Sequence, residues 1–335
     1  MIKVSVIIPV YHAAETIIRC IESLLSQTLA DLEVILVDDH GNDTSLQQVE
    51  ALLANHHRKT IFRFAETPQN LGPGEARNVG VRLAQGEFVA FLDSDDWVEP
   101  TMYEELYAVA LAHSADMAYC NAFLDTINSK SRLLSNPQMP QGVVTDESRA
   151  FFLTHYAAYL WTFIYRRDFL LEHGISFPPE RSSEDSYFIA CNVLLANSIA
   201  SVDNALYHYV VHAESLSQRR DENRYQQKIA VFARLIDFAK AHQIYTRYQA
   251  ELDFIYLKKA YLMAVFNYLI NASKPDKKTV DEINLILWSQ IPTYKSNRYY
   301  KNDFKVRLLV SFIIMMPRLA IACLPFFIRR SKLII

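Results

Sequence analysis

The segment Gly86-Glu-Phe-Val-Ala-Phe-Leu-Asp-Ser-Asp-Asp-Trp97 is the most informative stretch of this chain, because an apolar strand runs directly into three aspartates. Clustered carboxylates repel one another and raise each other's pKa unless a cation offsets them, and hard divalent metals prefer oxygen ligands. The segment therefore indicates a metal site at the carboxyl end of a strand. The alternative is a plain turn that leads into a helix opened by Pro100.

Composition places the chain among globular proteins with a substantial core. It has 335 residues, 51% of them hydrophobic, which is enough for one large or two modest domains. The 34 basic and 37 acidic residues nearly balance, which argues against a nucleic-acid partner bound by a broad charged surface. The four cysteines form no Cys-x-x-Cys pair, and the first strand begins without a signal-peptide pattern, so we expect a cytoplasmic protein without a zinc site.

Hydrophobic periodicity predicts a doubly wound α/β domain. Up to about residue 122, short apolar runs alternate with amphipathic stretches, which is typical of β-α-β units and a mostly parallel sheet. Residues 123–145, which follow this region, have mixed polarity and are interpreted as a connection. Residues 221–288 have a helical pattern. The expected strands are 4–10, 33–37, 61–65, 88–92 and 116–121, and the expected helices are 13–27, 44–57, 74–84 and 100–113.

Acidic residues follow most of the expected strands. Ligands of such sheets bind beyond the carboxyl ends of the strands. The second strand ends in Asp38-Asp39, the third in Glu66, and the fourth in the aspartate cluster. These ends suit a nucleoside whose base and ribose are hydrogen-bonded by carboxylates, and whose diphosphate arrives with a divalent metal.

Five sequence blocks, in order and spacing, resemble the family 2 glycosyltransferases of the GT-A fold, of the bacterial surface-polysaccharide type. The resemblance covers roughly residues 1–215 and implies a Rossmann-like, mostly parallel sheet flanked by helices, with a nucleotide-sugar half at 1–122 and an acceptor half at 123–215. A helical subdomain at 216–300 and a tail at 301–335 follow. The blocks are Val4-Ser-Val-Ile-Ile-Pro-Val-Tyr11, Glu33-Val-Ile-Leu-Val-Asp-Asp39, Asn70-Leu-Gly-Pro-Gly-Glu-Ala-Arg-Asn78, Phe91-Leu-Asp-Ser-Asp-Asp96 and Glu184-Asp185.

The resemblance also implies roles for single residues. Asp95 and Asp93 match the pair that holds Mn²⁺ or Mg²⁺ and the ribose, and His212 matches a basic residue that reaches the metal or diphosphate. Glu15 can equally be an ordinary acid of a first helical turn, Asn78 a structural residue, and His212 a structural histidine. The nucleotide-sugar contacts implied are Pro9, Tyr11, Glu15, Asp39, Arg77, Asn78 and Asp93.

Asp185 matches the family's general base, the catalytic residue that removes a proton from the acceptor hydroxyl during an inverting displacement. The alternative for Glu184-Asp185 is a helix N-terminus capped by Ser182 or Ser183, and both interpretations can hold together. Trp161 is either a platform for an acceptor sugar or a core residue.

The expected activity is that of a non-processive hexosyltransferase. It would move a sugar from a nucleotide sugar, expected to be UDP-linked, to a glycan or lipid-linked glycan acceptor in bacterial surface polysaccharide biosynthesis. Processive synthases of the family carry a Gln-x-x-Arg-Trp segment and long membrane spans, and this sequence has neither. The alternatives are a nucleotidyltransferase or phosphatase that uses the aspartates, which a missing glycine-rich phosphate loop disfavours, and a non-catalytic glycan-binding module.

The C-terminal tail is apolar and basic. Two apolar blocks, 308–316 and 319–328, are separated by Pro317-Arg318, and each is too short to span a bilayer. We expect one helix, or two that bend at Pro317, lying on the inner face of the membrane with basic residues on anionic headgroups. The alternative is an ordinary helix packed on the helical subdomain.

Overall fold

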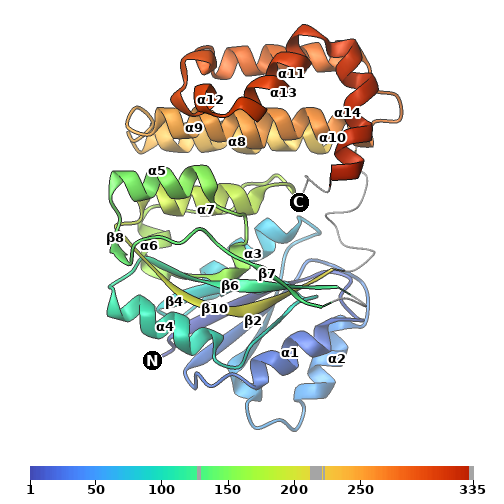
Figure 1. The fold of residues 1–335 in the computed structure, drawn as a ribbon. Helices are drawn as coiled ribbons and strands as arrows, with labels where there is room; N and C mark the ends of the chain where they lie inside the picture. The colour runs from blue at the N-terminus through green and yellow to red at the C-terminus, as the bar shows by residue number, and fades with distance from the viewer. Residues whose placement is uncertain (127–129, 212–220, 222, 332–335) are drawn as a thin grey trace. The chain divides into compact units, whose positions relative to one another are not determined.

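The computed structural model describes residues 1–126, 130–211, 221 and 223–331. The chain forms two compact units, Met1–Ser215 and Leu216–Ile335 (Figure 1). The first unit contains a sheet with helices on both faces, and the second is helical.

One ten-stranded sheet organises the first unit, in the order β3-β2-β1-β4-β9-β6-β10-β5, with β7 paired to β6 and β8 paired to β10. Strands β3, β2, β1 and β4 are mutually parallel, β9 runs antiparallel between β4 and β6, and β6 is parallel to β10. The strands are β1 (Val4–Val10), β2 (Leu32–Asp38), β3 (Phe62–Glu66), β4 (Phe88–Phe91), β5 (Trp97–Val98), β6 (Met117–Thr126), β7 (Arg132–Leu134), β8 (Gly142–Val143), β9 (Phe163–Arg166) and β10 (Ser198–Val211).

The predicted α/β fold is confirmed. The strand expected at 4–10 has those bounds, whereas the helix expected from residue 13 begins at Ile17, because residues 11–16 form a turn in which His12 has a φ of 50°. Residues 123–145, interpreted as a connection, instead contain the end of β6 and two short strands. The helices of this unit are α1 (Ile17–Leu25), α2 (Ser45–Leu53), α3 (Pro73–Leu83), α4 (Met102–Ala112), α5 (Asp146–His155), α6 (Arg167–Glu172) and α7 (Glu184–Leu195), with 3-10 turns at Lys59–Ile61 and Leu160–Thr162.

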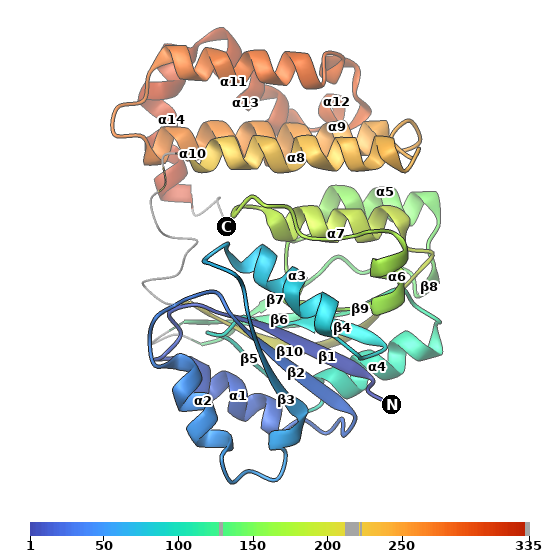
Figure 2. The same cartoon turned by 180° about the vertical axis from the view of Figure 1, so that it is seen from behind.

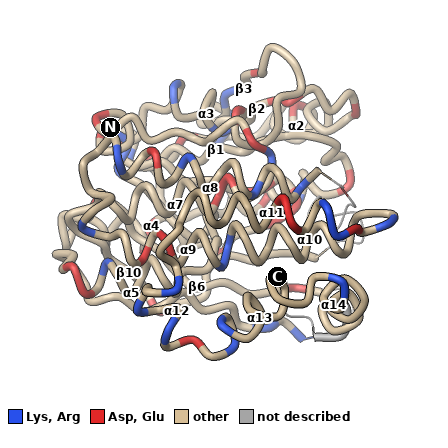
Figure 3. The backbone as a smooth tube through the Cα atoms, turned by 90° about the horizontal axis from the view of Figure 1, so that it is seen from above, with Lys and Arg blue, Asp and Glu red and all other residues tan. Residues whose placement is uncertain are grey.

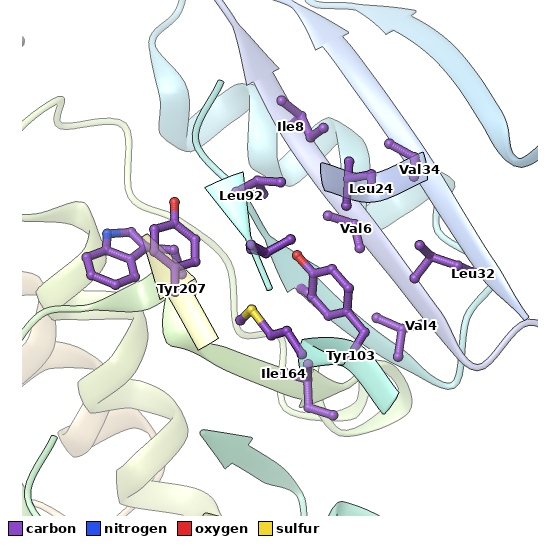
Figure 4. Close-up of a cluster of buried hydrophobic side chains, with 14 of the residues drawn as sticks. Val4, Val6, Ile8, Leu24, Leu32, Val34, Leu92, Tyr103, Ile164 and Tyr207 are labelled. Atoms are coloured by element: carbon purple, nitrogen blue, oxygen red, sulfur yellow. The ribbon is translucent and has the colours of Figure 1, made fainter. Parts of the chain in front are cut away.

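Helices α1, α2 and α4 cover one face of the sheet, and α3, α5 and α7 cover the other (Figure 2). Because side chains alternate along a strand, Val4, Val6 and Ile8 of β1 join the core beneath α1 and α4, which Figure 4 shows. On the opposite face, a Cβ atom added at Gly80 of α3 would lie 2.3 Å from the Cγ2 of Ile7. Glycine at that position therefore lets α3 pack directly on β1.

The second unit is helical, as the sequence predicts. Its tail helices each bury one face at a spacing of three or four residues, Val306, Val310 and Ile313 on one helix and Ala320, Leu324 and Ile328 on the next. The helices are α8 (Arg224–Ala241), α9 (Gln249–Ile255), a π-helix (Tyr256–Leu262), α10 (Met263–Asn271), α11 (Lys277–Gln290), α12 (Arg298–Asn302), α13 (Phe304–Met315) and α14 (Pro317–Ser331), with a 3-10 turn at Tyr294–Ser296.

Within the described ranges, no helix has both the length and the apolar character needed to cross a bilayer.

Candidate active site

The carboxyl ends of β1, β2 and β4 meet at one edge of the sheet, because these strands are parallel and in register. The backbone N–H of Asp39 donates to the Val10 carbonyl at 2.9 Å, and that of Leu92 donates to the Ile7 carbonyl at 3.0 Å. The residues that follow the three strands, Tyr11, Asp39 and Asp93, are thereby placed along one edge.

Asp39 is buried, with 2% of its surface exposed, and organises the loop that leads into α3. Its carboxylate accepts hydrogen bonds from the backbone N–H groups of Leu71 and Gly72, both at 2.8 Å, and from the Thr67 hydroxyl at 2.9 Å. Gly72 has a φ of +91°, which side chains rarely adopt, and Pro73 then opens the helix. Asp39 thus shapes this loop, and its contact with a nucleotide base stays a prediction.

The other residues predicted to bind the nucleotide near β1 lie in different environments. Pro9 is buried within the strand, and Tyr11 is 36% exposed with its ring 4.2 Å from the ring of His12. Glu15 is exposed in the turn before Ile17, so it is not an acid of the first turn of α1. Asp38 accepts from the backbone N–H of His40 at 2.9 Å and so holds its own loop.

The aspartate cluster divides into one buried and two partly exposed carboxylates. Asp96 is fully buried and accepts from the Tyr207 hydroxyl at 2.6 Å and from the backbone N–H of Val210 at 2.8 Å. Burial raises the pKa of Asp96, and the charges of Asp95 and Asp93 raise it further. The Tyr207 hydroxyl also accepts from the backbone N–H of Asp93 at 3.3 Å. Asp96 therefore ties the loop to β10, while Asp93 and Asp95 keep partly exposed side chains.

Arg77 of α3 joins the aspartate loop to the acidic pair of α7. Its guanidinium is 4% exposed and donates to Asp93 at 2.8 Å, to Asp185 at 3.1 Å and to Glu184 at 3.4 Å. Burial by itself would lower the pKa of Arg77, but Asp185, Asp93 and Glu184 outweigh burial and raise it. A buried cation therefore holds three carboxylates, one from the loop after β4 and two from α7, in one cluster.

Asp185 lies in the first turn of α7, with 26% of its side chain exposed. Burial raises its pKa well above the ordinary value for an aspartate, Arg77 opposes this rise, and Glu184 and Asp93 add to it. Ser183 occupies the N-cap position at a φ of 68° without a side-chain capping hydrogen bond, so the capping alternative is not observed there. A carboxyl whose pKa is shifted towards neutrality is suited to accept a proton.

Asn78 has the contacts of a structural residue. Its side-chain carbonyl accepts from the backbone N–H of Phe177 at 2.8 Å, and its amide donates to the Phe177 carbonyl at 3.1 Å and to Glu75 at 3.0 Å. These bonds attach α3 to the segment that precedes α7. They favour the structural alternative, and a ligand contact by Asn78 stays a prediction.

The histidines do not complete a metal site in the described structure. His212 lies outside the described residues. His208, the other histidine of β10, is held by Asp125 at 2.8 Å and Glu99 at 3.0 Å, and its ring stacks on Trp97 at 3.5 Å. Over the described ranges, no three His, Cys, Asp or Glu side chains come close enough to hold a metal without help from a substrate.

Two features of the site were missed by the sequence analysis. Arg77 forms ion pairs with three carboxylates, while its predicted contact with the nucleotide stays a prediction, and Tyr207 links Asp93 to Asp96. The two aspartates lie 111 and 114 positions from Tyr207, a separation that periodicity cannot bridge.

Known proteins resemble this chain in sequence and structure. The family model described as Glycosyl transferase family 2 matches residues 5–173. The putative glycosyltransferase EpsH of Bacillus subtilis (strain 168) is 31% identical over 268 residues, which is 78% of this chain and 76% of that protein. The crystal structure of S. aureus TarS 1-349 in complex with UDP-GlcNAc matches with a TM-score of 0.61 at 25% identity, covering 90% of this chain and 91% of that one.

A more distant likeness is to the mannosyltransferase PcManGT from Pyrobaculum calidifontis in complex with GDP-Man and Mn²⁺. Its TM-score is 0.52 at 18% identity, and the match covers 88% of this chain and 82% of that one. At this identity the likeness concerns the fold.

Proposed function

Since the chain belongs to glycosyl transferase family 2 and has the GT-A fold, we propose that it is a metal-dependent, inverting, non-processive transferase. It moves a hexose from a UDP-sugar to a glycan or lipid-linked glycan acceptor in bacterial surface polysaccharide biosynthesis. The observation that carries the proposal is Arg77, which holds Asp93, at the donor side, beside Asp185, a carboxyl tuned to accept a proton.

The donor binds along the edge formed by Tyr11, Asp39 and Asp93. Tyr11 is exposed enough to lie against a base, and Asp39 orders the loop that follows β3 by accepting from the backbone N–H groups of Leu71 and Gly72. The UDP-GlcNAc complex of TarS supports a uridine diphosphate donor. Pro9, Glu15 and Asn78 belong to this proposed donor site only through the family resemblance.

Asp95, with Asp93 beside it, would hold the metal, Mn²⁺ or Mg²⁺. The residues fit such an ion, because magnesium is usually bound by one or two carboxylates together with substrate phosphates and water. A bound divalent cation would neutralise charge on the departing nucleoside diphosphate. His212 is proposed as a further ligand, and the Mn²⁺ complex of PcManGT supports a metal in this fold.

Asp185 acts as the general base. Its carboxylate takes the proton of the acceptor hydroxyl as the hydroxyl oxygen forms a bond to the anomeric carbon. The bond from that carbon to the diphosphate oxygen breaks, and the electron pair leaves with the nucleoside diphosphate, so the anomeric configuration inverts. Arg77 keeps the carboxylate in place through its bond to Oδ1.

A donor panel tests the proposal. UDP-, GDP- and TDP-sugars are incubated with the full chain, and nucleoside diphosphate release is measured with Mn²⁺ and then with EDTA. We expect release from a UDP-sugar that EDTA abolishes, and an Asp185→Asn variant that binds UDP but loses most turnover. The proposal would be overturned if the protein bound none of the donors and released no nucleoside diphosphate from any of them, with or without metal.

We also propose that the outer face of α13 and α14 lies on an anionic membrane at the inner leaflet. Residues 304–335 contain six basic and no acidic residues, and Figure 3 shows the Lys and Arg positions along both helices. Lys305, Arg307 and Arg318 are exposed. The inner faces pack within the helical unit, so the packed alternative and the membrane proposal concern different faces. The apolar residues exposed here are Phe304, Leu308, Met315, Met316, Leu319, Phe326 and Phe327.

Vesicle flotation tests this surface. Because neighbouring basic and apolar residues act together at an interface, we expect the full chain to float with vesicles that contain phosphatidylglycerol, and less with neutral vesicles. Phe326→Ser with Phe327→Ser should reduce flotation, whereas Leu285→Ser, which changes an equally exposed leucine of α11, should not. Equal flotation of all three proteins contradicts the membrane proposal.

A further inference from the structure

A column of stacked aromatic rings crosses the acceptor half of the first unit. The Trp161 ring lies 4.1 Å from that of Tyr207 at an interplanar angle of 21°, 5.2 Å from Tyr159 at 26°, and 5.6 Å from Tyr209 at 14°. Trp161 is 6% exposed and contacts three other rings. It is therefore a core residue, and the alternative in which its own face receives a sugar does not fit the structure.

The inner end of this column is attached to the aspartate loop. Tyr207 is fully buried, and Figure 4 shows it within the apolar cluster of this unit. Its hydroxyl donates to Asp96 and accepts from the backbone of Asp93. The column is thus fixed next to the residues proposed to receive the donor diphosphate.

The outer end of the column is partly exposed at the same sheet edge. Tyr159 precedes β9, an antiparallel strand whose amino end lies at that edge, and Tyr209 is close to the carboxyl end of β10. Both rings are partly buried, and both pack against the core of this unit. Two partly exposed aromatic side chains therefore lie at this edge of the sheet.

A basic residue borders the two tyrosines. Tyr209 of β10 is in register with Leu124 of β6, which is in register with Arg132 of β7, so the three side chains lie on one face of the sheet. Arg132 is exposed, and its charge partly offsets the rise in pKa that burial causes at the Tyr159 hydroxyl. A guanidinium therefore stands near the outer rings.

We propose that Tyr159 and Tyr209 form a platform on which a pyranose ring of the acceptor stacks, with Arg132 donating hydrogen bonds to its hydroxyl or carboxylate oxygens. The inference rests on the proposed transferase function. The C–H face of a pyranose is apolar and its edge is polar, which matches rings that have an apolar body and a nearby donor. Both rings are within 5.6 Å of the buried Trp161 ring, which holds them in place.

Saturation-transfer NMR on the full chain tests the platform, with UDP and Mn²⁺ present. The probes are the methyl glycosides of glucose, galactose and N-acetylglucosamine. We expect the protons on one face of at least one ring to be saturated, and we expect Tyr159→Ala or Tyr209→Ala to weaken that binding about tenfold. Tyr159→Phe and Tyr209→Phe keep the ring and should bind nearly as the wild type does. Phe64→Ala, which removes an exposed ring of β3, serves as the matched control.

The outcomes separate the platform from the transferase function. The affinity for UDP, measured by calorimetry, should be the same in every variant. If the wild type does not bind UDP, the result contradicts the transferase proposal and not the platform. Undiminished glycoside binding by both Ala variants, or no glycoside binding by a wild type that binds UDP, overturns the platform. The platform is also refuted as an acceptor site if Tyr159→Ala and Tyr209→Ala leave glycoside binding unchanged and weaken only the binding of the sugar part of a UDP-sugar.

Discussion

Replacing Arg77 by methionine is the most direct test of how this site is built. The guanidinium is 4% exposed and lies within 3.4 Å of oxygens from Asp93, Glu184 and Asp185. Methionine has a similar length and fills the space, but it removes the positive charge that pairs with all three carboxylates. The change therefore isolates the electrostatic contribution from the packing contribution.

Breaking a buried ion pair by removing one partner costs about 3 to 5 kcal/mol, because uncompensated charge stays buried. Asp93 and Asp185 keep 31% and 26% side-chain exposure, so water screens them in part. We therefore expect the lower end of the range, about 3 kcal/mol. Arg77→Lys keeps the charge but loses the two-pronged geometry of the guanidinium, and it should be intermediate.

Urea unfolding followed by tryptophan fluorescence measures this cost. Trp97 and Trp161 lie in the first unit and Trp288 in the second, so a Trp288→Phe background reports on the first unit alone. Arg82→Met is the control, because its pair with Glu75 is exposed and contributes about 0 to 1 kcal/mol. If Arg77→Met costs no more than Arg82→Met, the three carboxylates do not depend on this cation and the reasoning fails.

Three further changes test other parts of the structure. Because burial raises the pKa of Asp185, the folded state holds its proton more tightly than the unfolded chain does. This contribution to the free energy of unfolding is present below about pH 4 and is lost as the pH rises through the folded pKa. The Asp185→Asn variant should therefore gain stability relative to the wild type as the pH rises, as measured by urea unfolding, and a stability difference that does not change with pH would contradict this. Gly72→Ala should cost about 1 to 3 kcal/mol by the same assay, because φ is +91° and the new Cβ would lie 3.0 Å from Arg181 Cγ, whereas Gly174→Ala meets no neighbour within 4 Å and should cost less. Asp95→Asn should abolish the Mn²⁺ dependence of UDP release while unfolding in EDTA stays unchanged, and a retained Mn²⁺ response would exclude Asp95 as the metal ligand.

Local patterns were sufficient for the α/β fold. A strand that is buried on both faces is apolar at nearly every position, and residues 4–10 fit that pattern, with the buried Ser5 as the polar exception. Aspartates after such strands are necessarily near the carboxyl edge of a parallel sheet, so Asp39, Asp93 and Asp95 could be placed there from their positions alone. The short strands β7 and β8 could not be predicted, because two or three residues carry no periodicity.

The division of labour among the polar residues depended on three-dimensional contacts. Arg77 and Asn78 are neighbours of similar polarity in sequence, yet one clamps three carboxylates and the other bonds to the backbone of Phe177. Asp93 is 16 positions from Arg77, but Glu184, Asp185 and the Phe177 partner of Asn78 lie about 100 positions away, on segments that the antiparallel β9 and helix α7 bring back to α3. The sequence gives the charge and hydrogen-bonding capacity of each side chain, but it does not show which residue the side chain contacts.

The sequence by itself determined the sheet, the edge at which a ligand would bind and the family resemblance, because each follows from residues close together along the chain. Only the tertiary structure decided that Asp96 is a buried anchor while Asp93 and Asp95 are partly exposed, and that Trp161 is buried and stacks with Tyr159 and Tyr209. The physical reason is burial: Tyr207 and Val210 of β10 cover Asp96 from more than 100 positions away, and residues so far apart in the chain share no local pattern.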